Sequence, residues 1–332
     1  MNLIKQPLKV KNTIFKNRIV MPPMATSKCI NGKVTRDLIE YYQMKAQGGY
    51  LGLIITEHQY VSKDGMADLG QISIADDSDI EGLKEVVRAI HQHDTKVIAQ
   101  ISHSGSAANK LETGLDVISA SAVIKPGSSK PTNTIPIAMD HNMIKTVVDS
   151  FANAAKRAEL AGFDGVQIHS AHGYLLNQFY SPLANQRHDD YGGSLENRVR
   201  IHLEIIAAIK ALVSDDFLIT LRLGASDYME GGSTIQDGVK AAKLFAAAGI
   251  DILDISGGFG GFKRESLIDS VYFSDASLAI KKEVNIPVIL TGGITDKQTA
   301  ESLLLNKKAD LIGVGRAILK DNDWAKKVIE SS

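Results

Sequence analysis

The chain has a single cysteine, Cys29, among its 332 residues. One thiol excludes a disulfide within the chain and any cluster that several of its own thiolates would hold. Neither sign of charge dominates, since 37 Lys and Arg stand against 38 Asp and Glu, for a formal net charge of -1. This balance argues against nucleic acid and against an anionic membrane surface as partners.

Long apolar runs are missing as well. No stretch approaches the length of a membrane span, and Met1 to Val10 lacks the apolar core of a signal peptide. We therefore expect a soluble, cytoplasmic protein without membrane contact. Hydrophobic residues make up 44% of the 332 positions, which is enough to bury a large core in one big domain or two small ones.

Short apolar runs alternate with amphipathic stretches along the chain. The runs that predict strands are 18–23, 51–56, 96–101, 165–169, 217–223, 251–256, 286–291 and 310–314. The stretches that predict helices are 36–48, 78–93, 144–161, 196–212, 234–248, 272–283, 296–306 and 321–330. Eight strand–helix units favour parallel pairing and closure. The sequence thus predicts an α/β fold in which residues 1–332 form a single (β/α)8 TIM barrel domain.

Details of the pattern support repeated units and two additions. Gly162 and Gly249 each stand where a predicted helix turns into a strand, and glycine suits the left-handed turn that ends a helix. Residues 3–16 predict a β-hairpin that caps the amino-terminal end of the barrel. Residues 104–142, rich in Ser, Pro, Gly and Thr, form a long excursion after the third strand. We expect this loop subdomain to lie over the active site, because long loops are usually functional.

The run 164–175 predicts a buried strand that stops at His169, His172 and Tyr174, followed by a long polar loop. Barrel enzymes place their chemistry at the carboxyl ends of strands. Two imidazoles and a phenol provide hydrogen-bond donors for a carbonyl oxygen and a proton source. Structural histidines and half of a metal site are the alternatives. Zinc needs at least three protein ligands, and no further motif supplies them, so we expect no metal.

Glycines cluster at the ends of the last two predicted strands, as Gly292-Gly293 and as Gly315 before Arg316. Loops after strands seven and eight form the usual phosphate site of barrels, and a guanidinium fork suits a phosphate. Tight turns alone would also explain the glycines. Neither 257–261 nor 313–316 completes the dinucleotide fingerprint, so a Rossmann domain is not expected.

Three further strand ends carry candidate residues. Arg222 stands between two leucines, so its charge requires a buried partner or an anion formed during a reaction. Gln100 can donate and accept at the edge of a heterocycle. For both, an internal polar network is the alternative. Pro22 and Pro23 fix an extended backbone that could form a wall against a flat ring.

Taken in order, these pieces resemble the Old Yellow Enzyme family of FMN-dependent ene-reductases. The stretches that carry the resemblance are 17–23, 52–57, 100–105, 168–175, 181–187, 190–198, Arg222, 291–293 and 313–316. The resemblance covers nearly the whole chain, and the block 168–198 is its most specific part.

The resemblance implies a bound FMN across the carboxyl end of the barrel. The residues implied to bind FMN are Pro22, Pro23, Met24, Ala25, Gln100, Arg222, Gly292, Gly293, Gly315 and Arg316. Hydride would pass from NADH or NADPH through flavin N5 to the β-carbon of an activated alkene. His169 and His172 would bind its carbonyl oxygen, and Tyr174 would protonate the α-carbon. His58 is a further candidate for contact with the substrate, and a packed or surface histidine is its alternative.

Some positions depart from the family pattern. Ala25 stands where many relatives have Thr or Cys, Ser27 where one subgroup has Tyr, and Ser106 where that subgroup has Arg. Together with 56–58, these residues resemble the barrel domain of enoate reductases and dienoyl-CoA reductases. Larger members there carry an iron–sulfur cluster and a second nucleotide domain. With one cysteine, we expect the barrel alone and no iron–sulfur cluster. Relatives often dimerise or tetramerise, so a homo-oligomer is compatible with the resemblance.

The predicted function is reduction of a small enone or enoate by an FMN-dependent NAD(P)H oxidoreductase. One alternative is a dehydrogenase that uses the same flavin on an amine or on another C–N or C–C bond. Another is a flavin-free barrel lyase or synthase that binds a phosphorylated metabolite, although no lysine stands at the reactive strand ends for a Schiff base. A flavin-binding protein without catalysis is the third.

Overall fold

The computed structural model describes residues 2–127, 134–264 and 271–331. Its centre is a closed barrel of parallel strands in the order β10–β11–β12–β3–β4–β5–β8–β9. Their bounds are β3 (Ile19–Met21), β4 (Leu53–Tyr60), β5 (Lys96–Ser102), β8 (Gly165–Ser170), β9 (Leu218–Ser226), β10 (Ile252–Gly257), β11 (Val288–Thr291) and β12 (Leu311–Gly313). Each predicted strand is present, and the predicted barrel is confirmed.

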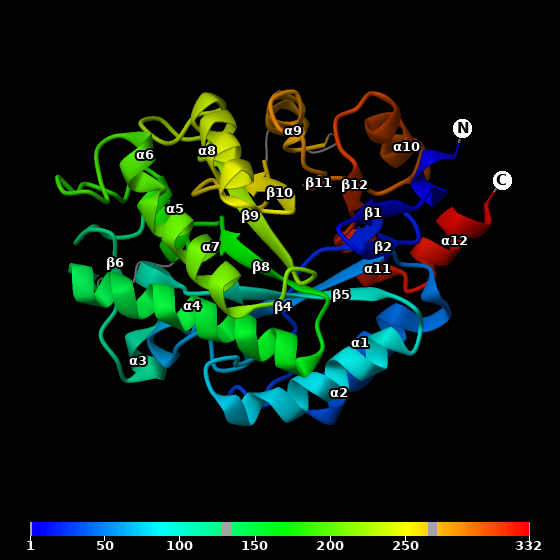
Figure 1. Cartoon of the computed structure of the whole chain (residues 1–332), viewed down its shortest axis with the longest axis horizontal. Coiled ribbons are helices and arrows are strands. Elements are labelled where there is room, and N and C mark those ends of the chain that lie inside the picture. The colour runs from blue at the N-terminus through cyan, green and yellow to red at the C-terminus, as the bar shows by residue number, and fades with distance from the viewer. Residues whose placement is uncertain (1, 128–133, 265–270, 332) are drawn as a thin grey trace.

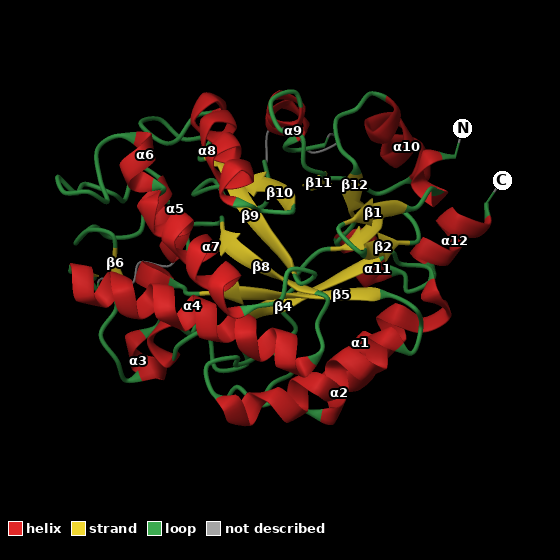
Figure 2. Cartoon of the chain, viewed as in Figure 1, coloured by secondary structure: helices red, strands yellow, loops and turns green. Residues whose placement is uncertain are grey.

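Helices surround the strands (Figures 1 and 2). The helices that overlap predicted ranges are α1 (Arg36–Ala46), α2 (Ile80–His91), α4 (His141–Ala161), α6 (Leu195–Arg198), α7 (Arg200–Leu212), α8 (Ile235–Ala248), α9 (Ser274–Lys281), α10 (Lys297–Leu305) and α12 (Trp324–Glu330). The helices that were not predicted are α3 (Lys110–Thr113), α5 (Leu175–Tyr180) and α11 (Arg316–Lys320). The polar loop predicted directly after Tyr174 is therefore wrong, because α5 begins at the next residue. Short 3-10 helices are η1 (Leu3–Lys5), η2 (Gln47–Gly49), η3 (Lys63–Gly65), η4 (Asp77–Asp79) and η5 (Gly105–Ala107).

The two ends of the chain lie side by side (Figure 1), where Lys5 Nζ donates to the Ser331 carbonyl at 2.8 Å. Within the described ranges, no helix is both long and apolar enough to cross a bilayer.

The helix-to-strand turns follow a common design. Gly162 ends α4 with φ 91° and Gly249 ends α8 with φ 102°, as predicted for left-handed turns. The aspartate that follows each turn then accepts a hydrogen bond from the neighbouring strand. Asp164 accepts from the Val97 amide and Asp251 accepts from the Ile219 amide, each at 2.8 Å. These bonds fix neighbouring strands in register at the amino-terminal end of the barrel.

A small hairpin packs under the same end. It pairs β1 (Leu8–Val10) with β2 (Thr13–Phe15) in antiparallel register, and the side chains of Val10 and Phe15 are buried. They belong to one apolar cluster with residues that line the lower barrel, namely Val20, Leu53, Ile55, Ile98, Leu218, Ile252, Ile289 and Leu311. The lower barrel is therefore a packed apolar core, which leaves the carboxyl end for chemistry.

The excursion after β5 is anchored by the 181–198 block. It contains β6 (Ile118–Ser119) and β7 (Ile137–Ala138), which pair in parallel. The guanidinium of Arg187 donates to the carbonyls of Ala120 at 2.8 Å and Met139 at 2.6 Å, near the two strands. These bonds hold the base of the excursion. Residues 128–133 of the predicted loop subdomain lie outside the described residues.

Candidate active site

A polar layer lies above the apolar core of the barrel. Gln100 Nε2 donates to Gln167 Oε1 at 2.8 Å, and Gln167 Nε2 donates to Asp254 Oδ2 at 3.3 Å. Thr291 Oγ1 donates to Asp254 Oδ1 at 3.0 Å. All four side chains are buried. The network therefore runs across the barrel from Gln100 on β5 to Thr291, the residue before Gly292.

The charge of Arg222 meets its partner in this layer. Its Nε lies 3.3 Å from Asp254 Oδ2, although the pair forms no hydrogen bond there. Burial raises the pKa of Asp254, and the neighbouring guanidinium opposes that rise. The predicted buried partner of Arg222 is thus Asp254, and the Nε–H of the guanidinium remains an unused donor among the described residues.

Four rings gather at the carboxyl end of the barrel. The centroid of His169 lies 5.1 Å from that of His172 and 5.1 Å from that of Tyr174. His58, from β4, lies 5.5 Å from Tyr174 and 6.5 Å from His169. The structure therefore brings together all the residues that were predicted to contact the substrate.

Burial keeps these rings uncharged near pH 7. Burial, reinforced by the positive charge of Arg222, lowers the pKa of His169 well below its usual value. Burial and Arg222 do the same to the pKa of His172. Burial also lowers the pKa of His58 to about 4 and raises the pKa of Tyr174 to about 12. The histidines are thus neutral donors, and Tyr174 retains its proton.

His172 is held in a strained backbone conformation, with φ 60°. Such a conformation persists where surrounding contacts fix it. The His172 amide donates to the Gly257 carbonyl at 3.2 Å, and Nε2 lies 2.8 Å from Ser256 Oγ. Arg222 Nη2 also donates to Ser256 Oγ, at 3.5 Å. Because Nε2 faces Ser256, Nδ1 is the nitrogen that remains for a ligand.

His169 and His58 differ in their partners. His169 Nδ1 is buried without a hydrogen-bond partner among the described residues, and such a polar atom is costly unless a ligand satisfies it. His58 Nδ1 lies 2.6 Å from the amide nitrogen of Gln71. The amide nitrogen must donate, so His58 carries its own proton on Nε2.

The segment after β3 is fixed by a buried carboxylate. Glu57 is 1% exposed, and it accepts from the Thr26 amide and from Thr26 Oγ1, both at 2.8 Å. Burial raises the pKa of Glu57 to about 7, and the bonds from Thr26 oppose that rise. The predicted wall of Pro22, Pro23, Met24 and Ala25 therefore ends in a rigid anchor.

The predicted phosphate site lies at the ends of β11 and β12. Gly292 and Gly293 have φ of 132° and 78°, which other residues rarely adopt. A side chain at Gly315 would stand 3.3 Å from Met24 Sδ, so this loop adjoins the wall after β3. Arg316 Nη2 donates to the Tyr272 hydroxyl at 2.7 Å. Bare backbone and a guanidinium thus stand together there.

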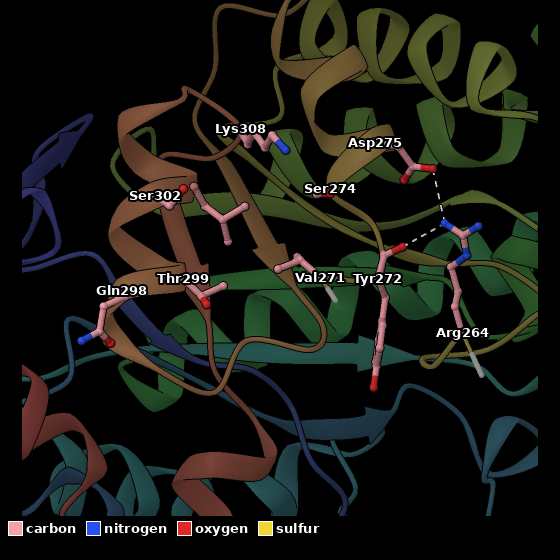
Figure 3. A pocket seen from close by; sticks show the side chains of 10 residues that line it. Arg264, Val271, Tyr272, Ser274, Asp275, Gln298, Thr299, Ser302 and Lys308 are labelled. Carbon is pink, nitrogen blue, oxygen red and sulfur yellow. Dashed lines mark hydrogen bonds and ion pairs between the residues drawn. The ribbon is translucent and has the colours of Figure 1, made fainter. Parts of the chain in front are cut away.

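A separate pocket lies outside the barrel between α9 and α10 (Figure 3). Its volume is about 770 Å³, and Tyr272, Asp275, Thr299 and Lys308 are among the residues that line it. Arg264 Nη1 closes one side by donating to the Tyr272 carbonyl at 3.1 Å and to Asp275 Oδ2 at 3.3 Å (Figure 3). None of the four clustered rings lines this pocket, so we place the chemistry in the ring cluster.

Sequence reasoning missed several residues of the site. Asp254 and Ser256 lie in an apolar strand, and an acid flanked by Leu253 and Ile255 is the same pattern that identified Arg222. Tyr272, and Lys125 with its Nζ 5.8 Å from the centroid of the Tyr174 ring, follow no periodic pattern. Their positions depend on loops that the sequence alone does not place.

Comparisons with known proteins agree with this geometry. A family model described as the NADH:flavin oxidoreductase / NADH oxidase family matches residues 4–331. An NADH oxidase of Thermoanaerobacter brockii is 39% identical to this chain, and the match covers 97% of this chain and 50% of that protein. An NADPH dehydrogenase of Bacillus cytotoxicus is 37% identical, over 95% of this chain and 88% of its own.

Solved structures are similar over the same length. A 2-naphthoyl-CoA reductase in complex with 2-naphthoyl-CoA has a TM-score of 0.92 at 27% identity, over 99% of this chain and 52% of that one. An old yellow enzyme homologue from Zymomonas mobilis has a TM-score of 0.86 at 27% identity, over 98% of this chain and 92% of that one. The chain spans about half the length of the NADH oxidase and of the naphthoyl-CoA reductase.

The predicted resemblance is therefore confirmed at the level of the family. The chain belongs to the NADH:flavin oxidoreductase / NADH oxidase family and has the barrel of an old yellow enzyme.

Proposed function

We propose that this chain is an FMN-dependent NAD(P)H oxidoreductase that reduces the activated C=C bond of an α,β-unsaturated carbonyl compound. The observation that carries the proposal is the ring cluster. Two neutral histidines and a protonated tyrosine lie with ring centroids 5.1 Å apart around His169. Such a site can polarise a carbonyl group and deliver a proton.

The residues present suit a flavin. Gln100 lies at the edge of the polar layer, and the buried Arg222 Nε has no hydrogen-bond partner among the described residues. The Gly315 backbone adjoins the wall after β3, and Arg316 begins α11 at the next residue. The residues we propose to bind FMN are Pro22, Pro23, Met24, Ala25, Gln100, Arg222, Gly292, Gly293, Gly315 and Arg316. When bound, FMN would accept hydride from NADH or NADPH and pass it to the alkene.

Within this proposal, His169 and His172 bind the carbonyl oxygen of the substrate. Their low pKa values keep both rings neutral, so each offers one N–H donor and adds no net charge. The unpartnered Nδ1 of His169 gains a partner when the oxygen binds. Both bonds strengthen as negative charge develops on that oxygen, and this strengthening lowers the barrier.

Tyr174 supplies the proton. Its pKa of about 12 keeps the proton on Oη at neutral pH, and an acid this weak gives up its proton only to a strongly basic carbon. His58 packs against the ring of Tyr174 at 5.5 Å between centroids and fixes its orientation. Arg222 contributes a positive charge beside the ring cluster, through Ser256.

Binding of phenols tests the histidine assignment. In the Old Yellow Enzyme family, phenols bind as anions over the flavin and give a long-wavelength absorbance. Replacing His169 or His172 with Ala should weaken a phenol such as 4-hydroxybenzaldehyde about tenfold or more, since each loses a charge-assisted hydrogen bond. His141→Ala, at an exposed position, is the control. Unchanged affinity in both site variants would overturn the assignment.

A further inference from the structure

Lys125 places a positive charge in the ring cluster from outside the barrel. The residue belongs to the excursion after β5, and its side chain is half-buried. Its Nζ lies 5.8 Å from the centroid of the Tyr174 ring and 3.4 Å from the His172 carbonyl oxygen. The excursion thus contributes a cation beside the proposed proton donor.

Neighbouring residues make room for this side chain. Gly173 has φ 72°, and a side chain there would stand 2.6 Å from Lys125 Cε and 3.1 Å from the Phe259 ring. Glycine at this position therefore lets the lysine stem cross the backbone between the two catalytic candidates His172 and Tyr174. The ammonium group is held at the site by its hydrogen bond to the His172 carbonyl and by the face of the Tyr174 ring.

The charge of Lys125 lacks a counter-ion within the described part of the chain. No carboxylate of these residues lies within 4.0 Å of its Nζ, whereas the other cation of the site, Arg222, has Asp254 at 3.3 Å. Burial lowers the pKa of Lys125, and both neighbouring histidines are neutral. A half-buried cation among neutral rings, with one long hydrogen bond to a carbonyl, is poorly satisfied.

We infer that Lys125 recognises a carboxylate on the substrate, so that the site selects α,β-unsaturated carbonyl compounds that carry a second, anionic group. This inference rests on the proposed function and specifies its substrate class. The carbonyl oxygen binds the histidine pair, and the carboxylate pairs with Lys125 beside Tyr174. A charge-assisted bond in a partly dry site adds selectivity that neutral enones cannot gain.

The phosphates of NADH or NADPH are another source of anionic oxygen, because the donor must reach the same end of the barrel. A substrate carboxylate and a nicotinamide phosphate would both offer anionic oxygens to Lys125. The two ligands differ in the half-reaction that would depend on Lys125. A role with the donor affects reduction of the flavin, while a role with the substrate carboxylate affects the second half-reaction alone.

The test uses the flavin-loaded protein with Lys125→Met, Lys125→Arg and Lys110→Met. Lys110 is an exposed lysine of the same excursion, paired with Asp116 at 2.6 Å, so its variant is the matched control. The probes are 4-hydroxybenzoate and its methyl ester, which differ in one negative charge. Binding is measured by calorimetry and by long-wavelength absorbance. A second pair, monomethyl and dimethyl fumarate, gives kcat/KM.

The inference predicts that the unaltered protein binds 4-hydroxybenzoate more tightly than the ester. Lys125→Met should weaken the acid about tenfold and change the ester less than about twofold. Lys125→Arg and Lys110→Met should retain the preference, and monomethyl fumarate should lose kcat/KM in Lys125→Met alone. Flavin reduction by NADH and NADPH should stay unchanged.

If Lys125→Met lost equal affinity for the acid and the ester, or lost affinity for neither, the inference would be overturned. Slower flavin reduction with an unchanged acid preference would assign Lys125 to the nicotinamide donor and also overturn it. The proposed function fails separately, through absence of reduction of cyclohexenone by the unaltered protein, and the calorimetric preference for the acid does not depend on that turnover.

Discussion

At the scale of single residues, burial sets the protonation states on which the proposed chemistry depends. His169 is 3% exposed, and its pKa falls for that reason, while the pKa of Tyr174 rises to about 12 for the same reason. Low polarity around the rings disfavours both imidazolium and phenolate. The pair therefore enters a reaction as a neutral donor and a weak acid.

Tyr174→Phe removes the proposed proton while it preserves the ring. We expect reduction of cyclohexenone by the reduced protein to slow by about 10² or more, the usual contribution of a general acid. Reduction of the flavin by NADH or NADPH should change little, because that step needs no proton from Tyr174. Stopped-flow absorbance separates the two half-reactions. Tyr191→Phe, which removes a hydroxyl bonded to Glu204, is the control, and equal losses in both half-reactions would refute the assignment.

His202 predicts how stability depends on pH. It is fully buried behind the site, its Nε2 lies 2.8 Å from Ser170 Oγ, and burial lowers its pKa to about 3 from the usual 6.5. Between pH 3 and pH 6.5, His202 therefore binds a proton in the unfolded chain but stays unprotonated in the folded chain. The contribution of His202 to the free energy of unfolding is therefore present in full above pH 6.5. As the pH falls below 6.5, this contribution decreases by up to about 1.4 kcal/mol per pH unit.

The variant His202→Gln tests that linkage. Urea unfolding midpoints of the unaltered protein should fall between pH 7 and pH 5, and His202→Gln should show a shallower decline because one titrating group is gone. His169 and His172 act in the same direction, so some decline should remain. Parallel curves for the two proteins would mean that His202 titrates normally in the fold.

Sequence reasoning at this scale identified groups that require a partner, but not every partner. The apolar flanks of Arg222 indicated a buried counter-charge, which is Asp254. Asp254 itself stands 32 positions further along, on the next strand, and only barrel pairing brings the two together. Lys125 was missed because neither periodicity nor a motif marks the excursion.

At the scale of elements, the sequence predicts the strands and helices that have a regular apolar pattern, but it does not predict short elements that are buried on all sides. The barrel strands appear where apolar runs predict them, because a parallel strand that is buried on both faces reads as a continuous apolar run. The sequence of α5 does not predict a helix, because all six of its residues are buried. A segment without a polar face has no helical period of apolar and polar residues. Its polar Gln178 is satisfied internally, by the carbonyls of Ser104 and Gly173.

The turn at Gly162 offers a clean test of a helix end. Its φ is 91°, and a side chain there would meet only Val87, at 3.6 Å. Gly162→Ala should therefore cost about 1 kcal/mol through backbone strain, without a clash. Gly162→Asn should cost less, because Asn tolerates the left-handed region. Urea unfolding of the three proteins measures both effects, and an alanine variant as stable as the asparagine variant would contradict the left-handed turn.

At the scale of the whole molecule, the barrel is layered along its axis. The hairpin and an apolar cluster close the amino-terminal end, the polar network around Asp254 spans the middle, and the four rings occupy the carboxyl end. The number of strand–helix units made the barrel predictable. The excursion was predictable only as a long insertion, because its folding depends on distant bonds such as those from Arg187.

The central claim is that this barrel transfers hydride from a nicotinamide to an activated alkene through bound FMN. Its most direct test is the visible spectrum of the purified protein, recorded without oxygen during addition of NADH or NADPH and then of cyclohexenone. We predict a flavin spectrum that bleaches with at least one nicotinamide and returns with the enone. A colourless protein that FMN cannot reconstitute, or a bound flavin that neither nicotinamide bleaches, would contradict the claim.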